Sequence, residues 1–400
     1  MTFEIDGPRP SQRAVHLLRA RNLKMARSAH AYVRGSTIKF YEWLEQGPRN
    51  VPSGPPIWIC GDCHIGNLGP LADAKGRVAV QIRDLDQTVI GNPAHDLIRL
   101  GLSLASAARS SDLPGVTTAH ILEEMTAGYE AAVAHAGNGA ESSAHRPKPI
   151  QALLRRSVRR RWRHLAEERL ETVEPSIPLG KRFWALTKKE RTALTAMLDA
   201  APVRKLITSL QGRDDHDPVE LLDAAYWIKG CSSLGRLRYA VLVRVGTGRN
   251  ASFCLIDAKE GVAAAAPRAA RAKMPRDNAA RVVSGAKALS PNLGQRMLAT
   301  RLFDKAIVIR ELMPQDLKID IDRLTRDEAV TVARYLAGVV GKAHGRQMDG
   351  HTRAAWLAAL KRKRSSALDA PSWLWLSVVE LMALHETAYL DHCRRYALAA

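Results

Sequence analysis

The apolar residues of this chain change from a helical to a strand-like period in two separate regions, and this constrains the fold more than any other feature. Around residue 240 the runs "RLRYAVLVRV" and "SFCLIDAK" flank a "GTGRN" turn, which predicts a β-hairpin. Around residue 80, "RVAVQIRDLD" predicts a strand that ends in acidic residues. "KAIVIRELMP" predicts one further strand. Most of the remaining sequence has helical spacing, so we predict an α+β fold whose strand regions are separated by helices.

Helix signals are strongest near the two ends of the chain. Residues 11–46 have helical spacing with an interruption near Gly35, and residues 325–347 open with Thr325 followed by Glu328, a capping box. A helix is also expected at 91–111, and the region from about 116 to 212 is predicted to be mostly helical.

Length and composition restrict the class of protein. Four hundred residues are enough for two or three domain-sized units, and no run approaches the 18 apolar residues of a membrane span. The start, "MTFEIDGPRPSQR", lacks the apolar core of a signal peptide. The five cysteines are scattered and odd in number, which is typical of a reducing compartment. We therefore expect a cytoplasmic protein without a membrane span.

The formal charge of +20 favours an anionic partner. The densest basic run, "LLRRSVRRRWRHLAEERL" at 153–170, would place Leu154, Val158, Trp162 and Leu165 in one stripe of a continuous helix. A solvated helix face is the favoured interpretation, because no recognised nucleic-acid-binding motif accompanies the run. Binding of nucleic acid through the basic helix 155–163 remains the alternative.

The loop "CGDCHIGN" at 60–67 allows two incompatible interpretations. Its Cys-x-x-Cys-His spacing is that of a c-type haem attachment site or part of a zinc site, but the second ligand pair that zinc needs is missing. The same loop contains Asp62 and Asn67, a carboxylate and an amide five residues apart. Cys60 and Cys63 are then interpreted as small buried residues.

Asp62 and Asn67 point to phosphoryl transfer when the next acidic loop is included. A carboxylate can orient the attacking hydroxyl, and an amide with a second carboxylate can hold Mg²⁺ across nucleotide phosphates. Asp84 follows the next predicted strand, with Asp86 as an additional metal ligand. Lys259, at the end of "FCLIDAK", would neutralise phosphate charge.

The stretch "ICGDCHIGNL…VQIRDLDQTVIGNPAHDLIRL" resembles the catalytic and metal loops of aminoglycoside-phosphotransferase-like kinases. That resemblance implies a catalytic base at Asp62, a Mg²⁺ ligand at Asn67 and a metal-binding aspartate at Asp84. It also implies a loop-bracing role for Asp96, and we assign His64 to the same supporting role.

Several further motifs resemble the uncharacterised bacterial family called domain of unknown function 2252. They occur in the same order and include "KMARSAHAYVRGS", "GDCHIGNLG", "IRDLDQT", "GCSSLGRLRYAVLV" and "LIDAKEG". Within the first of them, Arg34 is a candidate contact for an anion, although a helix-breaking turn at Gly35 explains that glycine equally well.

A kinase needs a nucleotide-binding lobe before its catalytic loop, and residues 1–50 show no such region. The missing parts occur later, which predicts a circularly permuted, two-lobed protein-kinase-like fold with extra helices. The expected parts are a 1–50 helical segment, 51–215 with the catalytic and metal loops, a 216–320 nucleotide-lobe-like region, and 321–400 completing the helical lobe. The predicted nucleotide-binding residues are Gly230, Ser232, Ser233, Gly235, Lys259, Glu311 and Met313.

This pattern departs from the kinase plan in two places. "GCSSLGRL" is not a P-loop, because no Lys-Ser/Thr follows its second glycine. No glutamate suitable for pairing with Lys259 follows it, apart from Glu260 beside it.

The resulting hypothesis is an ATP- and Mg²⁺-dependent phosphotransferase that acts on a hydroxyl of an unknown acceptor. Nucleotidyl transfer from the same site, with ATP bound in reverse, stays open. The alternative is a catalytically weak module that binds nucleotide, polyanion or nucleic acid.

Overall fold

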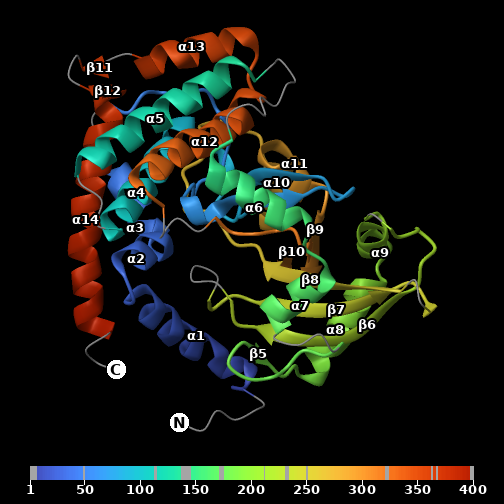
Figure 1. Ribbon diagram of the computed structural model, residues 1–400. Helices are drawn as coiled ribbons and strands as arrows, with labels where there is room; N and C mark the ends of the chain where they lie inside the picture. Colours follow the sequence, from blue (N-terminus) through green and yellow to red (C-terminus); the bar gives the residue numbers. More distant parts are fainter. Residues whose placement is uncertain are drawn as a thin grey trace.

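The chain folds into a mixed α+β structure, seen here in a computed structural model (Figure 1). The structure describes residues 7–47, 50–111, 115–136, 146–170, 175–210, 212–229, 234–248, 251–319, 324–361, 364–365 and 368–396. One half is built on a sheet and the other is mainly helical (Figure 1). None of the described helices is long and apolar enough to cross a membrane.

A six-stranded antiparallel sheet forms the first half, in the order β5-β6-β7-β8-β10-β9. The predicted hairpin is present as β7 and β8, and the strand predicted from "KAIVIRELMP" is β10. The strand β9 was not predicted. The bounds are β5 (Phe183–Trp184), β6 (Val219–Trp227), β7 (Arg238–Val245), β8 (Ser252–Glu260), β9 (Met297–Leu302) and β10 (Lys305–Leu312).

The two faces of this sheet bury different elements, because successive side chains of a strand point to opposite sides. Val241, Val243 and Ile256 belong to a core shared with α8 (Lys188–Asp199) and α9 (Ala201–Thr208). Leu242 and Leu255 belong to a second core with α7 (Trp162–Leu170) on the opposite face. The sheet is therefore covered on both sides over much of its area.

The helical half has one large core in which α5 (Gly115–Ala134) packs along α12 (Arg326–Gly345). The capping box predicted at Thr325 and Glu328 is confirmed at the start of α12. The other elements of this half are α4 (Pro93–Ser110), α6 (Lys148–Val158), α13 (Gly350–Lys361), α14 (Ser372–Tyr396) and the short strands β11 (Arg364–Ser365) and β12 (Leu368–Pro371).

Two short strand pairs carry the acidic loops on the helical half. β1 (Ile57–Ile59) pairs with β4 (Val89–Gly91), and β2 (Leu68–Ala72) pairs with β3 (Val78–Ile82). The short helix η1 (Ile65–Asn67) precedes β2. The helices α10 (Asn278–Leu289) and α11 (Pro291–Gly294) follow β8 in the chain, and α10 contacts both β10 of the sheet and β1.

The predicted N-terminal helical segment is present as α1 (Pro10–Met25), α2 (Ala29–Gly35) and α3 (Thr37–Glu45). α1 joins the two halves along one side of the molecule (Figure 1). Near its start, Arg13 forms a buried ion pair with Glu190 of α8, at 2.6 Å. Near its end, the carbonyl of Asn22 accepts a hydrogen bond from His392 of α14. α1 therefore contacts both the sheet half and the helical half and links them.

The prediction of one continuous basic helix at 153–170 was wrong. α6 ends at Val158 and α7 begins at Trp162. Val158, placed in the apolar stripe by a continuous helix, is 56% exposed. The break lets Arg160 turn inward, where its guanidinium donates to the carbonyl of Pro314 and pairs with Glu168.

The cores divide the chain differently from the predicted sequence segments. β5, α8 and α9 precede residue 216 but pack with the six-stranded sheet. Part of α10 packs in the large core of the helical half.

Candidate functional site

The loop that carries Asp62 is fixed from beneath by Asp96, which lies in the first turn of α4. The carboxylate of Asp96 accepts hydrogen bonds from the backbone N–H groups of Cys60, at 2.7 Å, and Gly61, at 2.9 Å. Gly61 has a φ of +76°, and a Cβ there would lie 2.2 Å from the carbonyl oxygen of Gln87. Glycine therefore allows the Asp62 loop to lie directly against the Asp84–Gln87 loop.

Asp96 is itself held by a buried chain of polar groups. His344 of α12 lies 3.1 Å from its carboxylate and 2.9 Å from the hydroxyl of Tyr129. Trp356 donates to the same hydroxyl at 3.0 Å. A buried charge is stable where hydrogen-bonding partners surround it. This series of hydrogen-bonded side chains therefore fixes the loop relative to α5, α12 and α13.

The buried carboxylate of Asp62 has Arg99 as its closest partner and also lies near the Thr37 hydroxyl, which lowers its pKa. Its Oδ1 atom accepts a hydrogen bond from Arg99 Nε at 2.9 Å, and Arg99 is fully buried. Its Oδ2 atom lies 3.9 Å from His64 Nε2. Burial raises the pKa of Asp62, although the positive charge of Arg99 opposes that rise. A raised pKa makes Asp62 a better proton acceptor when it is ionised.

Asn67 lies at the other end of the loop. Its side-chain Nδ2 donates to the backbone carbonyl of Asp62 at 3.0 Å, which leaves its Oδ1 atom for a ligand. Its own carbonyl accepts from the backbone N–H of Arg83 at 2.7 Å. The β2–β3 hairpin thereby returns the chain beside Asn67, immediately before Asp84.

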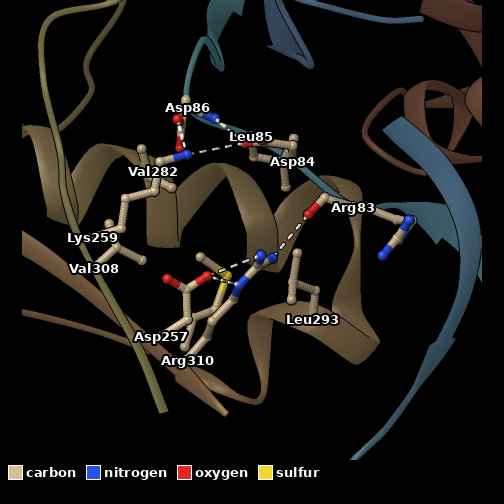
Figure 2. A pocket seen from close by; sticks show the side chains of 11 residues that line it. Arg83, Asp84, Leu85, Asp86, Asp257, Lys259, Val282, Leu293, Val308 and Arg310 are labelled. Carbon is tan, nitrogen blue, oxygen red and sulfur yellow. Dashed lines mark hydrogen bonds and ion pairs between the residues drawn. The ribbon is translucent and has the colours of Figure 1, made fainter. Parts of the chain in front are cut away.

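The Lys259 side chain reaches from β8 of the sheet to the acidic loop of the helical half, as Figure 2 shows. Its ammonium group donates to Asp86 Oδ2 and lies 3.8 Å from Asp84 Oδ1. Lys259 lies 173 residues from Asp86 in sequence, and it forms one ion-pair cluster with Asp84 and Asp86 between the two halves.

The two carboxylates of this cluster have different electrostatic surroundings. Burial raises the pKa of Asp84, but Lys259 and other nearby cations outweigh this effect and hold it well below its usual value. Burial and the neighbouring charge of Asp84 raise the pKa of Asp86, against the effect of Lys259. Asp84 therefore remains ionised, and 42% of its side chain is exposed.

A second charged network lies on the same face of the sheet. Asp257, two residues before Lys259, is buried and accepts two hydrogen bonds from Arg238, at 2.8 and 2.6 Å. Arg310 of β10 also pairs with Asp257 and donates to the backbone carbonyl of Arg83 at 3.1 Å (Figure 2). This network ties the sheet to the backbone just before Asp84.

Two cavities flank Asp84 and Asp86. The first cavity, including its mouth, has a volume of about 340 Å³ that no atoms fill. It lies between the Asp84 loop, Lys259 and apolar residues of α10, α11, β9 and β10. The second has about 540 Å³ measured in the same way. Its lining residues are Arg21, Gly35, Thr37, Ile38, Asp62, Asn67, Asp84, Asp86, Gln87, Arg236 and Ala265. The predicted base and metal ligands therefore share one cleft.

The other predicted site residues are placed as follows. Gly230, Ser232 and Ser233 lie outside the described residues. Gly235 has a φ of +96°, and a Cβ added there would meet no described atom within 4 Å beyond its chain neighbours. Glu311 directs its carboxylate to Arg213, at 2.6 Å, and its carbonyl accepts from Arg296. Neither Glu311 nor Met313 lines the two cavities.

His64, within the loop, and Arg34, beside it, do not line the two cavities. His64 is buried, and this burial together with the charge of Arg34 holds its pKa well below the usual range, so it is neutral. The Arg34 guanidinium lies against Gly66, and its buried Nε has no hydrogen-bond partner in the part of the chain that the structure describes. Cys60 and Cys63 are buried in the core, so neither thiol is open to a haem. In the described part of the chain, no three His, Cys, Asp or Glu side chains group to hold a metal.

Comparison with protein-family models matches residues 13–395 to a family described as "Uncharacterized protein conserved in bacteria (DUF2252)". The chain belongs to this family. No curated protein and no solved structure matches the DUF2252 chain. The match includes Asp62, Asn67, Asp84 and Lys259, so the whole cleft is part of the family region.

Sequence reasoning missed the partner of Lys259. The kinase plan places a partner glutamate on the helix after the lysine strand, but in the DUF2252 chain Glu260 pairs with Lys305 and Lys259 pairs with Asp86. Asp86 was expected only as a metal ligand. Arg99 was also missed, although it lies three residues after Asp96, on the helix that braces the loop.

Proposed function

We propose that the DUF2252 chain is a Mg²⁺- and ATP-dependent phosphotransferase that acts on a hydroxyl group of its acceptor. One observation supports this proposal most strongly. Lys259 of the sheet meets Asp84 and Asp86 at the edge of a cleft that Asp62 and Asn67 also line. Phosphoryl transfer needs this combination of a base, oxygen ligands for a metal and a phosphate-binding cation.

Each residue has a defined role in the proposed reaction. Asp62 accepts the proton of the acceptor hydroxyl while the hydroxyl oxygen forms a bond to the γ-phosphorus of ATP. The bond from this phosphorus to the β-phosphate bridging oxygen breaks, and ADP leaves with the electron pair. Lys259 binds phosphate oxygens. Arg99 holds the Asp62 carboxylate in place through its Nε hydrogen bond.

The donor set fits Mg²⁺. This ion is commonly bound by one or two carboxylates together with substrate phosphates, and it prefers oxygen ligands. Asp84 and the Oδ1 atom of Asn67 supply such oxygens, and Asp86 is the additional carboxylate. The bound ion would neutralise the charge of the phosphate oxygens. In the present arrangement the Lys259 ammonium supplies positive charge to both aspartates.

The order of the elements supports a circularly permuted kinase-like fold. In protein kinases a Gly-rich loop is followed by a strand with the phosphate-pairing lysine and then by a helix, before the catalytic Asp and Asn. Here the glycine-containing segment 230–235 precedes β7, Lys259 lies on β8 and α10 follows. Continuing through β10 and α12 to the chain end, and then from the start, leads to the Asp62 loop and Asp84.

The pairing of Lys259 differs from that in kinases, and this affects how nucleotide phosphates are expected to bind. Kinases pair this lysine with a glutamate of the following helix, whereas Lys259 pairs with Asp86 and Asp84. Nucleotide phosphates must therefore compete with these carboxylates for Lys259. Nucleotidyl transfer would use the same residues with the nucleotide reversed, and analysis of the product distinguishes the two reactions. A nucleotide-dependent activity belongs in the cytoplasm, where ATP is present.

The nucleic-acid alternative receives no support from the basic segment. The Arg160 side chain donates a hydrogen bond to the carbonyl of Pro314 and forms an ion pair with Glu168. The Arg161 side chain donates to nearby backbone carbonyls. Arg155, Arg156 and Arg159 are exposed, as on an ordinary solvated face.

Thermal unfolding with and without Mg²⁺-ATP tests the proposal. A ligand that binds only the folded state stabilises it by about 2.7 kcal/mol at a hundredfold excess over its Kd. We expect Mg²⁺-ATP to raise the unfolding temperature of the natural chain and of Asp199→Asn, which removes an exposed acid elsewhere. Asp84→Asn should lose most of this rise. Absence of any rise in the natural chain, with Mg²⁺ or Mn²⁺, would refute the proposal.

A further inference from the structure

The second cavity has one wall that the proposed phosphate chemistry does not use. Arg21 of α1 and Gly35, Thr37 and Ile38 at the junction of α2 and α3 line it together with Asp62 and Asp84. α1 passes along this side of the molecule between its two halves (Figure 1). The N-terminal segment therefore forms part of the cleft as well as joining the halves.

Thr37 places a buried hydroxyl in this wall, close to Asp62. The residue is only 6% exposed, and its Oγ1 atom lies near enough to lower the pKa of the Asp62 carboxyl, but among the described residues it makes no hydrogen bond of normal geometry. Hydroxyl groups that are removed from water normally have a partner. Because Thr37 lines the same cavity as Asp62, a polar atom of a bound molecule can supply that partner beside the proposed base.

Arg21 brings a positive charge to this wall of the cavity. Its Nη2 atom donates to the backbone carbonyl of Gly35 at 3.3 Å, and its buried Nε has no partner among the described residues. No ion pair joins Arg21 to a carboxylate in the described part of the chain. The acids of the cleft already have cations, since Asp62 pairs with Arg99 and Asp86 pairs with Lys259.

Arg236 lies on the sheet wall of the same cavity, just before β7 and on the same half as Lys259. This position suits contact with nucleotide phosphates. Arg21 belongs to the other wall, with Thr37. The two arginines therefore belong to different walls of one cleft.

We propose that Arg21 and Thr37 form the acceptor subsite, and that the acceptor is a small hydroxyl compound carrying an anionic phosphate or carboxylate group. Arg21 binds the anionic group, Thr37 hydrogen-bonds to a polar atom near the reacting hydroxyl, and Asp62 accepts the hydroxyl proton. This inference rests on the proposed phosphotransferase function. It also excludes polycationic acceptors, because Arg21 would repel them.

Binding to the full chain without nucleotide tests the subsite separately from turnover. The probes are glycerol 3-phosphate, glycerate, glycerol and ethanolamine, titrated calorimetrically at constant ionic strength. We expect one or both anionic probes to bind, and the neutral and cationic probes to bind at least about tenfold more weakly, as loss of one charged hydrogen bond predicts. Comparing the two anions shows whether phosphate or carboxylate is preferred.

Variants then locate the anion. Arg21→Gln and Thr37→Val should each weaken the anionic probe about tenfold or more. Arg19→Gln removes the same charge from an exposed position of α1 and should leave binding unchanged. Weakening by Arg236→Gln and not by Arg21→Gln would place the anion on the nucleotide side of the cleft and would overturn the proposal. Equal weakening by all three arginine variants would mean that overall charge attracts the anion, and would overturn the proposal.

The outcome for the acceptor subsite is distinguishable from that for the phosphotransferase. If the anionic probes bind and need Arg21 and Thr37, but the chain forms no ADP from Mg²⁺-ATP, the acceptor-subsite proposal is supported and the phosphotransferase proposal is refuted. Stabilisation by Mg²⁺-ATP with no preference for the anionic probes over glycerol retains nucleotide binding and refutes the subsite.

Discussion

At the scale of single residues, the cleft is made by side chains whose charges are only partly matched. Asp62 has Arg99 as a close partner, and Lys259 is shared between Asp84 and Asp86. Asp62, Asp84, Asp86 and Lys259 were singled out from the sequence because the proposed phosphoryl transfer needs few groups, whereas Arg99 was not. The pairing of Lys259 with Asp86 could not be predicted, since it depends on how the sheet approaches a loop 173 residues away in sequence.

The pH dependence of turnover tests the role of Asp62. A base must be deprotonated to act, so the rate should fall as the pH falls through the pKa of Asp62. Because burial raises this pKa, the fall should be centred above the ordinary aspartate value of about 3.9. Removing the charge of Arg99 with Arg99→Met should move the fall to still higher pH. The measurement is kcat/KM for phosphate transfer across the pH range.

Arg99→Lys is the matched control for this experiment, because it keeps the positive charge and changes the shape of the side chain. Its acid limb should lie closer to that of the natural chain than the limb of Arg99→Met. Circular dichroism checks that both variants are folded. An acid limb that does not move in Arg99→Met would assign the proton acceptor to a group other than Asp62.

At the scale of secondary-structure elements, strong periodicity and capping predicted most helices and the main strands. α12 begins at its predicted capping box, and β7 and β8 form the predicted hairpin. β9 was missed because "MLATRL" has only a weak alternation, and its pairing with β10 defines it. The break between α6 and α7 was missed because the run of arginines at 159–161 is compatible with a helix. Contacts of Arg160 with Pro314 favour the turn instead.

α1 is the element whose anchoring can be tested most directly. Arg13 is buried and contacts Glu190 at 2.6 and 3.3 Å, and Tyr239 donates to the same carboxylate at 3.0 Å. Arg13→Ala would leave the buried Glu190 charge without its cation, which typically costs about 3–5 kcal/mol of unfolding free energy. We expect a loss of this size at pH 7 in urea denaturation. Arg19→Ala, exposed on the same helix, should cost about 0.5 kcal/mol or less.

The pH dependence of this loss identifies its cause. Burial raises the pKa of Glu190, but hydrogen bonds from Arg13 and Thr187 outweigh it and lower the pKa below the ordinary value. The stabilisation from this lowered pKa is present above the unfolded-state pKa and is lost as the pH falls through the folded-state pKa. The difference between the natural chain and Arg13→Ala should therefore shrink below about pH 4. An equal difference at about pH 3 and at pH 7 would assign the loss to packing.

At the scale of the whole molecule, the cleft is assembled from three distant parts of the chain. The N-terminal segment supplies Arg21 and Thr37, the following loops supply Asp62 and Asp84, and the sheet supplies Lys259. Local sequence patterns predict the chemistry of each part separately. How the parts meet depends on packing between elements, such as α10 against β10 and β1, which no single stretch of sequence specifies.

A rearranged chain tests whether the order of these parts matters less than their packing. The new chain starts at His216, in an exposed turn before β6, and a Gly/Ser linker joins residue 400 to residue 1. His392 contacts Asn22, and the helix from Pro10 to Asn22 spans about 18 Å, so a flexible linker of roughly 20 residues can bridge the ends. We expect cooperative unfolding and a Mg²⁺-ATP stabilisation equal to that of the natural order, because permutation at exposed sites is generally tolerated. The control is the natural-order chain with the same linker added at its end. A folded rearranged chain that does not respond to Mg²⁺-ATP, while the control does, would contradict the permuted kinase-like arrangement. Such a result would mean that the glycine-containing segment, Lys259 and the Asp62 loop need their natural order to form the cleft.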